Sequence, residues 1–194
     1  MTVLKLLRFH LTNLTNFAGR EDRGAFWPYV ACVFAFMMAG MTAIMVPMMM
    51  NTFAKMQQFA VAHPEQATIE SGPGSYSITI QGSHPELMPD FGNIIGAVAA
   101  VCILVICLLA AAVVRRLHDR GKSGLWGLMP VPFLMAGFAI MPVAMRELDS
   151  DITLFFILFF NNLIYLVCLG ALVLLLAGAG SLGENRYGPP PTGD

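Results

Sequence analysis

The chain has 194 residues, of which 57% are hydrophobic and only 12% are charged, and its formal net charge is −1. A soluble domain carries about a quarter of its residues as charged side chains, so this composition excludes an ordinary soluble protein. The small net charge gives no indication of nucleic-acid binding, and we expect none. The sequence therefore predicts a protein of the membrane.

Neither cysteine nor methionine predicts a metal centre. The cysteines lie inside apolar runs with no CxxC or Cys/His spacing, which is typical of small buried hydrophobic side chains. Methionines cluster between Met37 and Met50, and their thioethers, together with His63 and His84, could bind Cu(I). Flexible apolar packing is the favoured interpretation of that cluster, so we predict no metal and no cofactor. The cysteines are Cys32, Cys102, Cys107 and Cys168.

The first predicted element along the chain is a short amphipathic helix over residues 4–17. Its leucines recur at three- and four-residue spacing and form an apolar stripe, while Lys5, Arg8 and Asn13 lie elsewhere around the helix. Such a helix lies either in the membrane interface or packed against the rest of the protein, and the sequence leaves both open.

Four long apolar stretches follow, at about residues 26–50, 93–114, 125–145 and 153–178. Each is long enough, at about 1.5 Å per residue, to cross a hydrocarbon core of roughly 30 Å. They predict an all-α membrane protein with four transmembrane helices, in which residues 1–194 form a single membrane domain.

Prolines and amides distinguish the third and fourth stretches. Pro130, Pro132 and Pro142 predict that the third helix is kinked or broken. The adjacent amides of Asn161 and Asn162 are costly on a lipid face. We therefore expect both to point into the bundle and to hydrogen-bond another helix.

Residues 51–90 form a polar insert between the first and second stretches. Polar and apolar residues alternate from Ser75 to Gln81, as they do in a strand. Thr68–Glu70 can pair with this segment across the turn at residues 71–74, so we predict a small hairpin. At the other end of the chain, residues 180–194 form a polar tail whose triple proline predicts extended chain.

Lysine and arginine are unequally divided between the two sides of the membrane. Four spans put both termini on one side, and nine of the 11 Lys and Arg residues fall on that side. The positive-inside rule then places both termini in the cytoplasm and the insert outside it. The same topology brings three polar motifs, near residues 17–27, 115–124 and 183–189, to one membrane face.

The three motifs also identify a family. The first is Phe17-x-Gly19-Arg20, followed by Arg23 and the pair Phe26-Trp27. The second is Arg115-Arg116-Leu117-His118-Asp119-x-Gly121-Lys122-Ser123-Gly124, and the third is Gly183-x-Asn185-Arg186-Tyr187-Gly188-Pro189. In these motifs the chain resembles the bacterial inner-membrane proteins of the family "domain of unknown function 805". The resemblance covers nearly the whole chain apart from the insert. It implies a small multi-pass protein of the bacterial inner membrane, with no established catalytic residues.

The second motif indicates an anion site. Gly121-Lys122-Ser123 is not a Walker A motif, because Arg116 stands where that motif has glycine and no strand precedes it. Lys122 and Ser123 instead stand at the predicted start of a helix, where free N–H groups favour an anion such as a phospholipid head group. The predicted anion or head-group site consists of Arg115, Arg116, His118, Arg120, Lys122 and Ser123.

Charged residues of all three motifs predict a polar network on the same face. Asp119 can bridge arginines of the other motifs, so we interpret His118-Asp119 as part of a structural network rather than as a catalytic pair. The predicted network consists of Arg20, Arg23, Asp119, Glu184, Asn185 and Arg186.

The sequence favours a structural or partner-binding membrane protein over an enzyme. Its expected partners are anionic membrane lipids, together with either a second copy or another membrane protein. Two alternatives stay open. One is a small-solute transporter or channel subunit that acts as an oligomer. The other is a membrane enzyme that acts on a lipid head group through His118 and Asp119.

Overall fold

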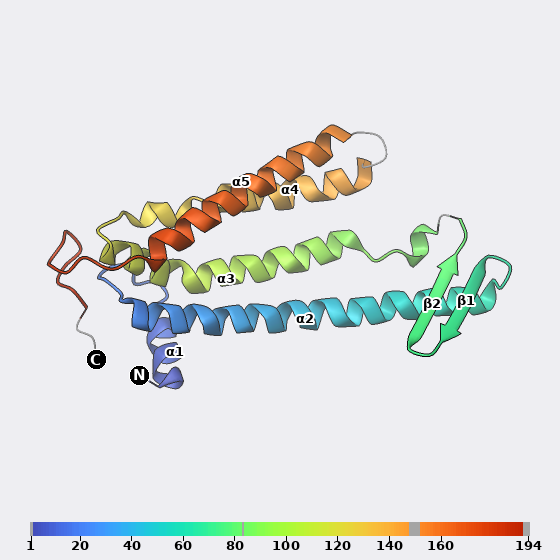
Figure 1. The fold of residues 1–194 in the computed structure, drawn as a ribbon, viewed down its shortest axis with the longest axis horizontal. Helices are drawn as coiled ribbons and strands as arrows, with labels where there is room; N and C mark the ends of the chain where they lie inside the picture. The colour runs from blue at the N-terminus through green and yellow to red at the C-terminus, as the bar shows by residue number, and fades with distance from the viewer. Residues whose placement is uncertain (1, 83, 148–151, 192–194) are drawn as a thin grey trace.

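The computed structural model describes residues 2–82, 84–147 and 152–191, and it is mostly helical. Among these residues, four helices are long and apolar enough to cross a membrane, as the sequence predicts. Figure 1 shows their arrangement. In chain order the elements are α1 (Val3–Thr12), α2 (Arg23–Ala62), β1 (Ala67–Gly72), β2 (Ser75–Ile80), η1 (Pro85–Leu87), α3 (Phe91–Asp119), η2 (Gly124–Leu128), α4 (Val131–Glu147) and α5 (Ile152–Ala177).

The spans form two antiparallel pairs that join at one end only. Helix α2 lies along α3, and α4 lies along α5 (Figure 1). The second pair diverges from the first as it leaves the end where both chain termini lie. The buried core is correspondingly concentrated at the joined end, and it includes Phe26, Tyr29, Leu117, Leu172 and Leu176.

Helix α2 is longer than the predicted first span. It has 40 residues and continues from Met50 to Ala62, which adds about 18 Å at 1.5 Å per residue. Residues 51–62 are more polar than the preceding run, but they contain neither glycine nor proline, and roughly half of them are Ala, Gln, Met or Lys, which favour helix. The change in polarity after Met50 therefore does not mark the end of the helix.

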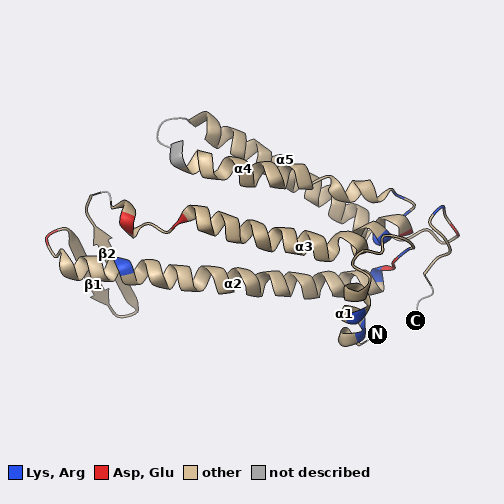
Figure 2. Cartoon of the chain, turned by 180° about the vertical axis from the view of Figure 1, so that it is seen from behind, with Lys and Arg blue, Asp and Glu red and all other residues tan. Residues whose placement is uncertain are grey.

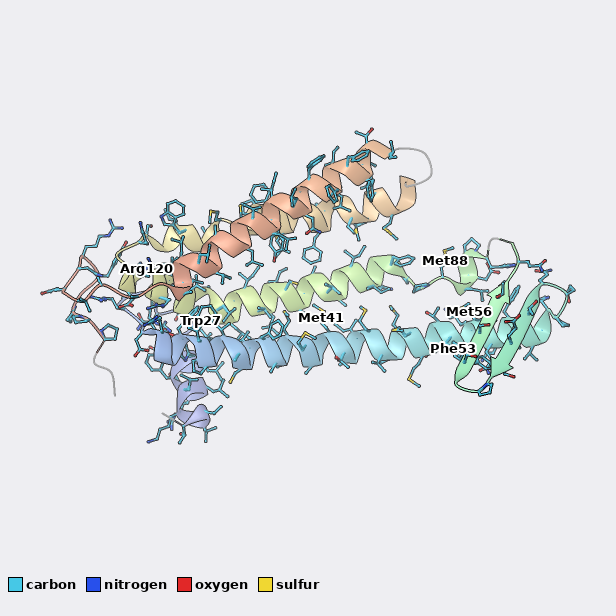
Figure 3. All side chains as sticks on the ribbon, in the orientation of Figure 1. Trp27, Met41, Phe53, Met56, Met88 and Arg120 are labelled. Carbon is cyan, nitrogen blue, oxygen red and sulfur yellow. The ribbon has the colours of Figure 1, made fainter. Side chains whose placement is uncertain are left out.

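The insert packs on this extension of α2. Strands β1 and β2 pair antiparallel, with Thr68 opposite Thr79, and Gly74 supplies the positive φ of 83° in the turn between them. The Gln57 amide donates to the Tyr76 hydroxyl at 3.3 Å, and Phe53 contacts the Tyr76 ring. Figure 3 shows Phe53 at this end of the molecule and Trp27 at the opposite end. The sheet corrects the all-α description of the fold.

The third span is broken near its start. Gly124–Leu128 forms a short 3₁₀ helix, and α4 begins only at Val131, directly after the buried Pro130. Proline lacks an N–H donor, so Pro130 and Pro132 cannot donate the backbone hydrogen bonds that would continue one regular helix through this segment. Pro142 lies inside α4. The prediction of a broken third helix is confirmed.

The two amides of α5 have different surroundings. Asn161 donates a hydrogen bond from Nδ2 to the backbone oxygen of Phe133 on α4, at 2.9 Å, as predicted. Asn162 is instead exposed on the outer face of α5. Adjacent residues of a helix point about 100° apart, so a helix that directs one amide at its neighbour directs the next one away.

Helix α1 ends at Thr12, earlier than the predicted residue 17, and it crosses the first turns of α2 (Figure 1). One side of it is packed, because Leu6 and His10 are buried. The other side is open, because Leu4 is 78% exposed. The helix therefore packs against the bundle and also presents an apolar side to its surroundings.

Candidate functional site

Three segments far apart in the sequence meet at the joined end of the bundle. We call them the polar cap and define it as residues 10–23, 115–124 and 178–188. Lysine and arginine gather at this end, as Figure 2 shows. The cap holds the ends of α1 and α3, the loop before α2, and the C-terminal tail that follows α5.

A buried carboxylate forms the first cluster of the cap. Glu21 Oε2 accepts a hydrogen bond from Arg115 Nε at 2.9 Å and forms an ion pair with Nη2 at 2.8 Å, and Oε1 lies 2.8 Å from His10 Nε2. The other ring nitrogen of His10 faces the backbone oxygen of Leu6 at 2.9 Å. Both ring nitrogens thus face acceptors, and only the imidazolium form can donate to both. The His10 ring also stacks on Tyr29 at 3.8 Å.

Asp119 forms the second cluster. Its Oδ1 accepts from Arg20 Nε and Nη2 at 3.1 and 2.9 Å, and its Oδ2 accepts from Arg116 Nη1. Arg20 also donates to the backbone oxygens of Ser181 and Gly183, at 2.6 and 2.8 Å. One arginine therefore ties the loop before α2 to both the end of α3 and the tail.

Arg116 of α3 and Arg120, which directly follows that helix, cap the end of α5. Arg116 donates from Nε to the backbone oxygen of Leu176 at 2.9 Å, and from Nη2 to that of Gly178. Arg120 donates to the backbone oxygen of Leu175 at 2.7 Å. The last carbonyls of a helix have no partner within it, and positive charge is favourable there. These contacts join the α2–α3 pair to the α4–α5 pair.

The tail folds back over the end of α3. Asn185 donates from Nδ2 to the backbone oxygen of His118 at 3.0 Å, and the Tyr187 ring stacks on His118 at 3.7 Å. The guanidinium group of Arg186 lies over Tyr187, 4.7 Å from the ring centroid. His118 Nδ1 is 3.3 Å from the backbone oxygen of Gly19. His118 is therefore enclosed by the first and third motifs.

The residues predicted for an anion site have two different environments. Arg115, Arg116 and Arg120 direct their donors at protein oxygens, and Arg116 is 0% exposed. Lys122 is exposed, and its ammonium group contacts no acceptor within the described parts of the chain. The Ser123 hydroxyl accepts from the backbone N–H of Leu125 at 3.3 Å, at the start of a 3₁₀ helix of only five residues.

The predicted polar network is also divided. Arg20, Asp119 and Asn185 lie together in the contacts described above, whereas Arg23 and Glu184 are exposed. Sequence reasoning missed His10 and Glu21, which are as deeply buried as any residue of the network. Glu21 could have been identified as a network member from its sequence position, because it lies in a turn between Arg20 and Arg23. Nothing in the pattern of the N-terminal helix identified His10.

Two positions after α5 require glycine because side chains from the end of α3 approach their Cα atoms closely. A Cβ atom at Gly180 would overlap the carboxylate of Asp119, and one at Gly178 would overlap the guanidinium group of Arg120. The Asp119 carboxylate is held on both sides by arginines, so it cannot move aside. The overlap explains why glycines recur in this segment, which reads Gly178-Ala-Gly180.

We predict that Gly180→Ala destabilises the protein by about 1–3 kcal/mol, the usual cost of overpacking a well-packed site. Thermal unfolding of the purified protein in detergent would measure the change. Gly183→Ala is the matched control, because a Cβ atom there has nothing within 4 Å and the backbone has no positive φ. Equal melting temperatures for the two variants would contradict the packing that we describe.

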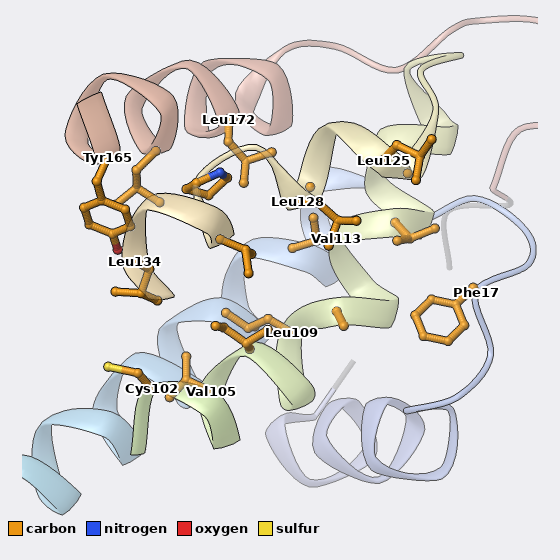
Figure 4. A pocket seen from close by; sticks show the side chains of 18 of the residues that line it. Phe17, Cys102, Val105, Leu109, Val113, Leu125, Leu128, Leu134, Tyr165 and Leu172 are labelled. Atoms are coloured by element: carbon orange, nitrogen blue, oxygen red, sulfur yellow. The ribbon is translucent and has the colours of Figure 1, made fainter. Parts of the chain in front are cut away.

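A large apolar pocket begins beside the cap. It has a volume of about 720 Å³ and lies between α3, the segment η2–α4, and α5. Figure 4 shows Phe17 and Leu125 at one end and Cys102 and Tyr165 at the other. Ser123 lines the end near the cap, and the other lining residues are nearly all apolar. Neither His118 nor Asp119 lines it.

The comparisons with known proteins agree with the motifs of the cap. The profile of the family described as "Protein of unknown function (DUF805)" matches residues 14–189. The chain belongs to this family. The match extends from the loop before α2 to the end of the third motif, so it includes nearly all of the cap.

Two curated relatives belong to Escherichia coli. The "Uncharacterized protein YiiR" of strain K12 and that of O157:H7 are each 38% identical to the chain over 96 residues. The alignment covers 46% of this chain and 58% of each relative. No solved structure matches the chain.

Proposed function

We propose that this membrane protein binds an anionic phospholipid of the cytoplasmic leaflet. In this proposal one acyl chain occupies the apolar pocket, and the phosphate lies near Lys122 and Ser123. The observation that carries the proposal is a pocket of about 720 Å³ that is almost wholly apolar and begins beside an unpaired ammonium group.

The length of the pocket suits an acyl chain. The α3 residues that line it extend from Cys102 to Val114, which is about 18 Å of helix at 1.5 Å per residue. Half of a hydrocarbon core is about 15 Å thick, so a lipid in the adjacent leaflet would have its chain at the same depth. Leu125 and Leu128 line the pocket and are 73% and 57% exposed, which leaves a way in from the side.

The charge of the cap suits an anionic head group. The described residues at this end include nine Lys and Arg but only four Asp and Glu, an excess of five positive charges. By the positive-inside rule this end faces the cytoplasm, where anionic lipids attract basic residues by about 1 kcal/mol each. Lys122 is well placed for a phosphate, because the neighbouring arginines are occupied by protein oxygens.

The two alternative functions gain less support from the geometry. A lipid-modifying enzyme would need His118 and Asp119 to face a substrate, but Tyr187 covers His118 and two arginines hold Asp119. A solute pathway would need polar side chains along α4 and α5. Asn161 instead bonds to the backbone of Phe133, and the pocket beside these helices is apolar.

Blocking the pocket should reduce lipid binding. Ala110 lines the pocket, so Ala110→Phe would place a ring where the chain is proposed to lie. Excluding two CH₂ groups costs about 1.6 kcal/mol, which corresponds to a loss of affinity of about 15-fold. Native mass spectrometry of the purified protein with phosphatidylglycerol, phosphatidylcholine or inorganic phosphate would measure what is retained.

Two further variants separate chain binding from head-group binding. Ala100→Phe introduces the same ring at an exposed position of α3 outside the pocket, and it should retain as much lipid as the wild type. Lys122→Ala should weaken phosphatidylglycerol about fivefold, by loss of one cation near the phosphate, and phosphatidylcholine less. Equal retention of both lipids by Ala110→Phe and Ala100→Phe would overturn the proposal, as would tight binding of inorganic phosphate alone.

A further inference from the structure

The outer face of α5 carries a regular seam that no part of the chain covers within the described residues. Its members recur at three- and four-residue intervals, which is the spacing by which one helix packs along another. They are exposed although most are large and apolar; Phe159 is 53% exposed and Leu166 is 57% exposed. The seam consists of Phe155, Phe159, Asn162, Leu166, Gly170 and Val173.

Asn162 is the polar member of this seam. It lies ten residues into a 26-residue span, which is about 15 Å along the helix and within the hydrocarbon core. Its amide is exposed and has no hydrogen-bonding partner in the part of the chain that the structure describes. An amide that faces lipid leaves two donors and an acceptor unsatisfied, and such residues normally face another helix. The seam therefore requires a partner that offers a polar group at the depth of Asn162.

We propose that the partner is a second copy of this chain, packed through α5 against α5 about a two-fold axis normal to the membrane. Under that symmetry each residue near the axis meets its own counterpart at the same depth. An amide is self-complementary, because its N–H₂ group can donate to the carbonyl oxygen of an identical amide. The two copies would thus satisfy each other at Asn162 without any other polar residue.

Gly170 supports a close approach on the same seam. A Cβ atom there would have nothing within 4 Å, so the packing of this chain on itself does not require the glycine. Small residues at a helix–helix contact in the membrane let two backbones approach and gain van der Waals contact. The seam lies apart from the lipid pocket, since none of its members lines that pocket. The dimer proposal and the lipid proposal can therefore be tested, and refuted, independently of each other.

Cysteine cross-linking in native membranes would test the geometry. In a full-length chain with its four cysteines replaced by alanine, Leu166→Cys should form a disulfide-linked dimer on mild oxidation. Val167→Cys is the matched control. Val167 is 64% exposed and at nearly the same depth, but it points about 100° away from the seam. Cross-linking of Val167→Cys equal to or above that of Leu166→Cys would overturn the proposal.

Self-association in liposomes would test the amide. Single-molecule photobleaching of the labelled wild type should show dimers, and Asn162→Leu should weaken dimerisation about threefold to tenfold, as expected for the loss of interhelical hydrogen bonds in a membrane. Asn162→Leu makes an exposed face more apolar, so it should not impair folding. A monomeric wild type, or unchanged dimerisation in the variant, would show that lipid or a different protein covers the seam.

Discussion

Replacing Arg116 by methionine should lower the free energy of unfolding by about 3 kcal/mol, because the buried Asp119 carboxylate loses one of its two cations and two backbone oxygens lose their donor. Methionine fills a similar volume but donates no hydrogen bond. The variant would leave Asp119 with Arg20 as its remaining cation, and it would leave the backbone oxygens of Leu176 and Gly178 without their donor. Because those oxygens end α5, the contact between the two helical pairs should weaken. Steric trapping in bicelles would measure the unfolding free energy.

Lys122→Met provides the comparison for Arg116→Met. It removes a cation from the same motif, but Lys122 is exposed and contacts no acceptor in the described chain. Exposed substitutions usually change stability by less than about 0.5 kcal/mol. A destabilisation by Arg116→Met no larger than that by Lys122→Met would contradict a structural role for the buried arginine. The two variants also separate stability from lipid binding, which we expect to depend on Lys122.

The fold could be predicted largely because membrane spans are determined by length and apolar composition. Four uncharged runs of suitable length predicted the four spans, and the prolines of the third run predicted the break before α4. The end of α2 was placed wrongly because two criteria diverge there. Hydropathy falls near residue 51, whereas helix propensity stays favourable until His63-Pro64, where the helix ends. The alternation at Ser75–Ile80 identified a strand because its period of two differs from that of a helix.

The partners within the cap were harder to predict. Topology alone groups the three motifs at one membrane face, but Arg115, Arg116 and Lys122 are equivalent in sequence as cations. Their surroundings differ because of where each lies relative to α3. The first two meet carboxylates and carbonyls brought by other elements, and the third lies beyond the end of the helix. The burial of His10 depends on the crossing of α1 over α2, which no local pattern encodes.

Replacing Glu21 should also have a large effect, because this buried carboxylate contacts both the guanidinium group of Arg115 and the imidazole ring of His10. Glu21→Gln keeps the size of the side chain but removes its charge, and it replaces one acceptor oxygen with an N–H₂ donor. That donor would face either Arg115 or His10, both of which also donate at this place. We expect a loss of about 3 kcal/mol in the free energy of unfolding, since the buried guanidinium group of Arg115 then lacks its counter-charge. Chemical or thermal unfolding of the purified protein would measure it.

A double-mutant cycle with Arg115→Met would show whether the loss arises from the ion pair. Arg115→Met alone leaves the Glu21 charge buried with only the His10 ring as its side-chain partner, so it should also be costly. In the double variant the amide oxygen at position 21 has only His10 to satisfy, and no guanidinium group is left without a counter-charge. The double variant should therefore lose less stability than the two single variants together, by about 0.5–3 kcal/mol. Strictly additive losses would mean that Glu21 and Arg115 act separately, for example through the Arg115 hydrogen bond to the backbone oxygen of Asn16. A positive coupling would instead assign this cluster the role of fixing α1 and the first turn of α2 onto the end of α3.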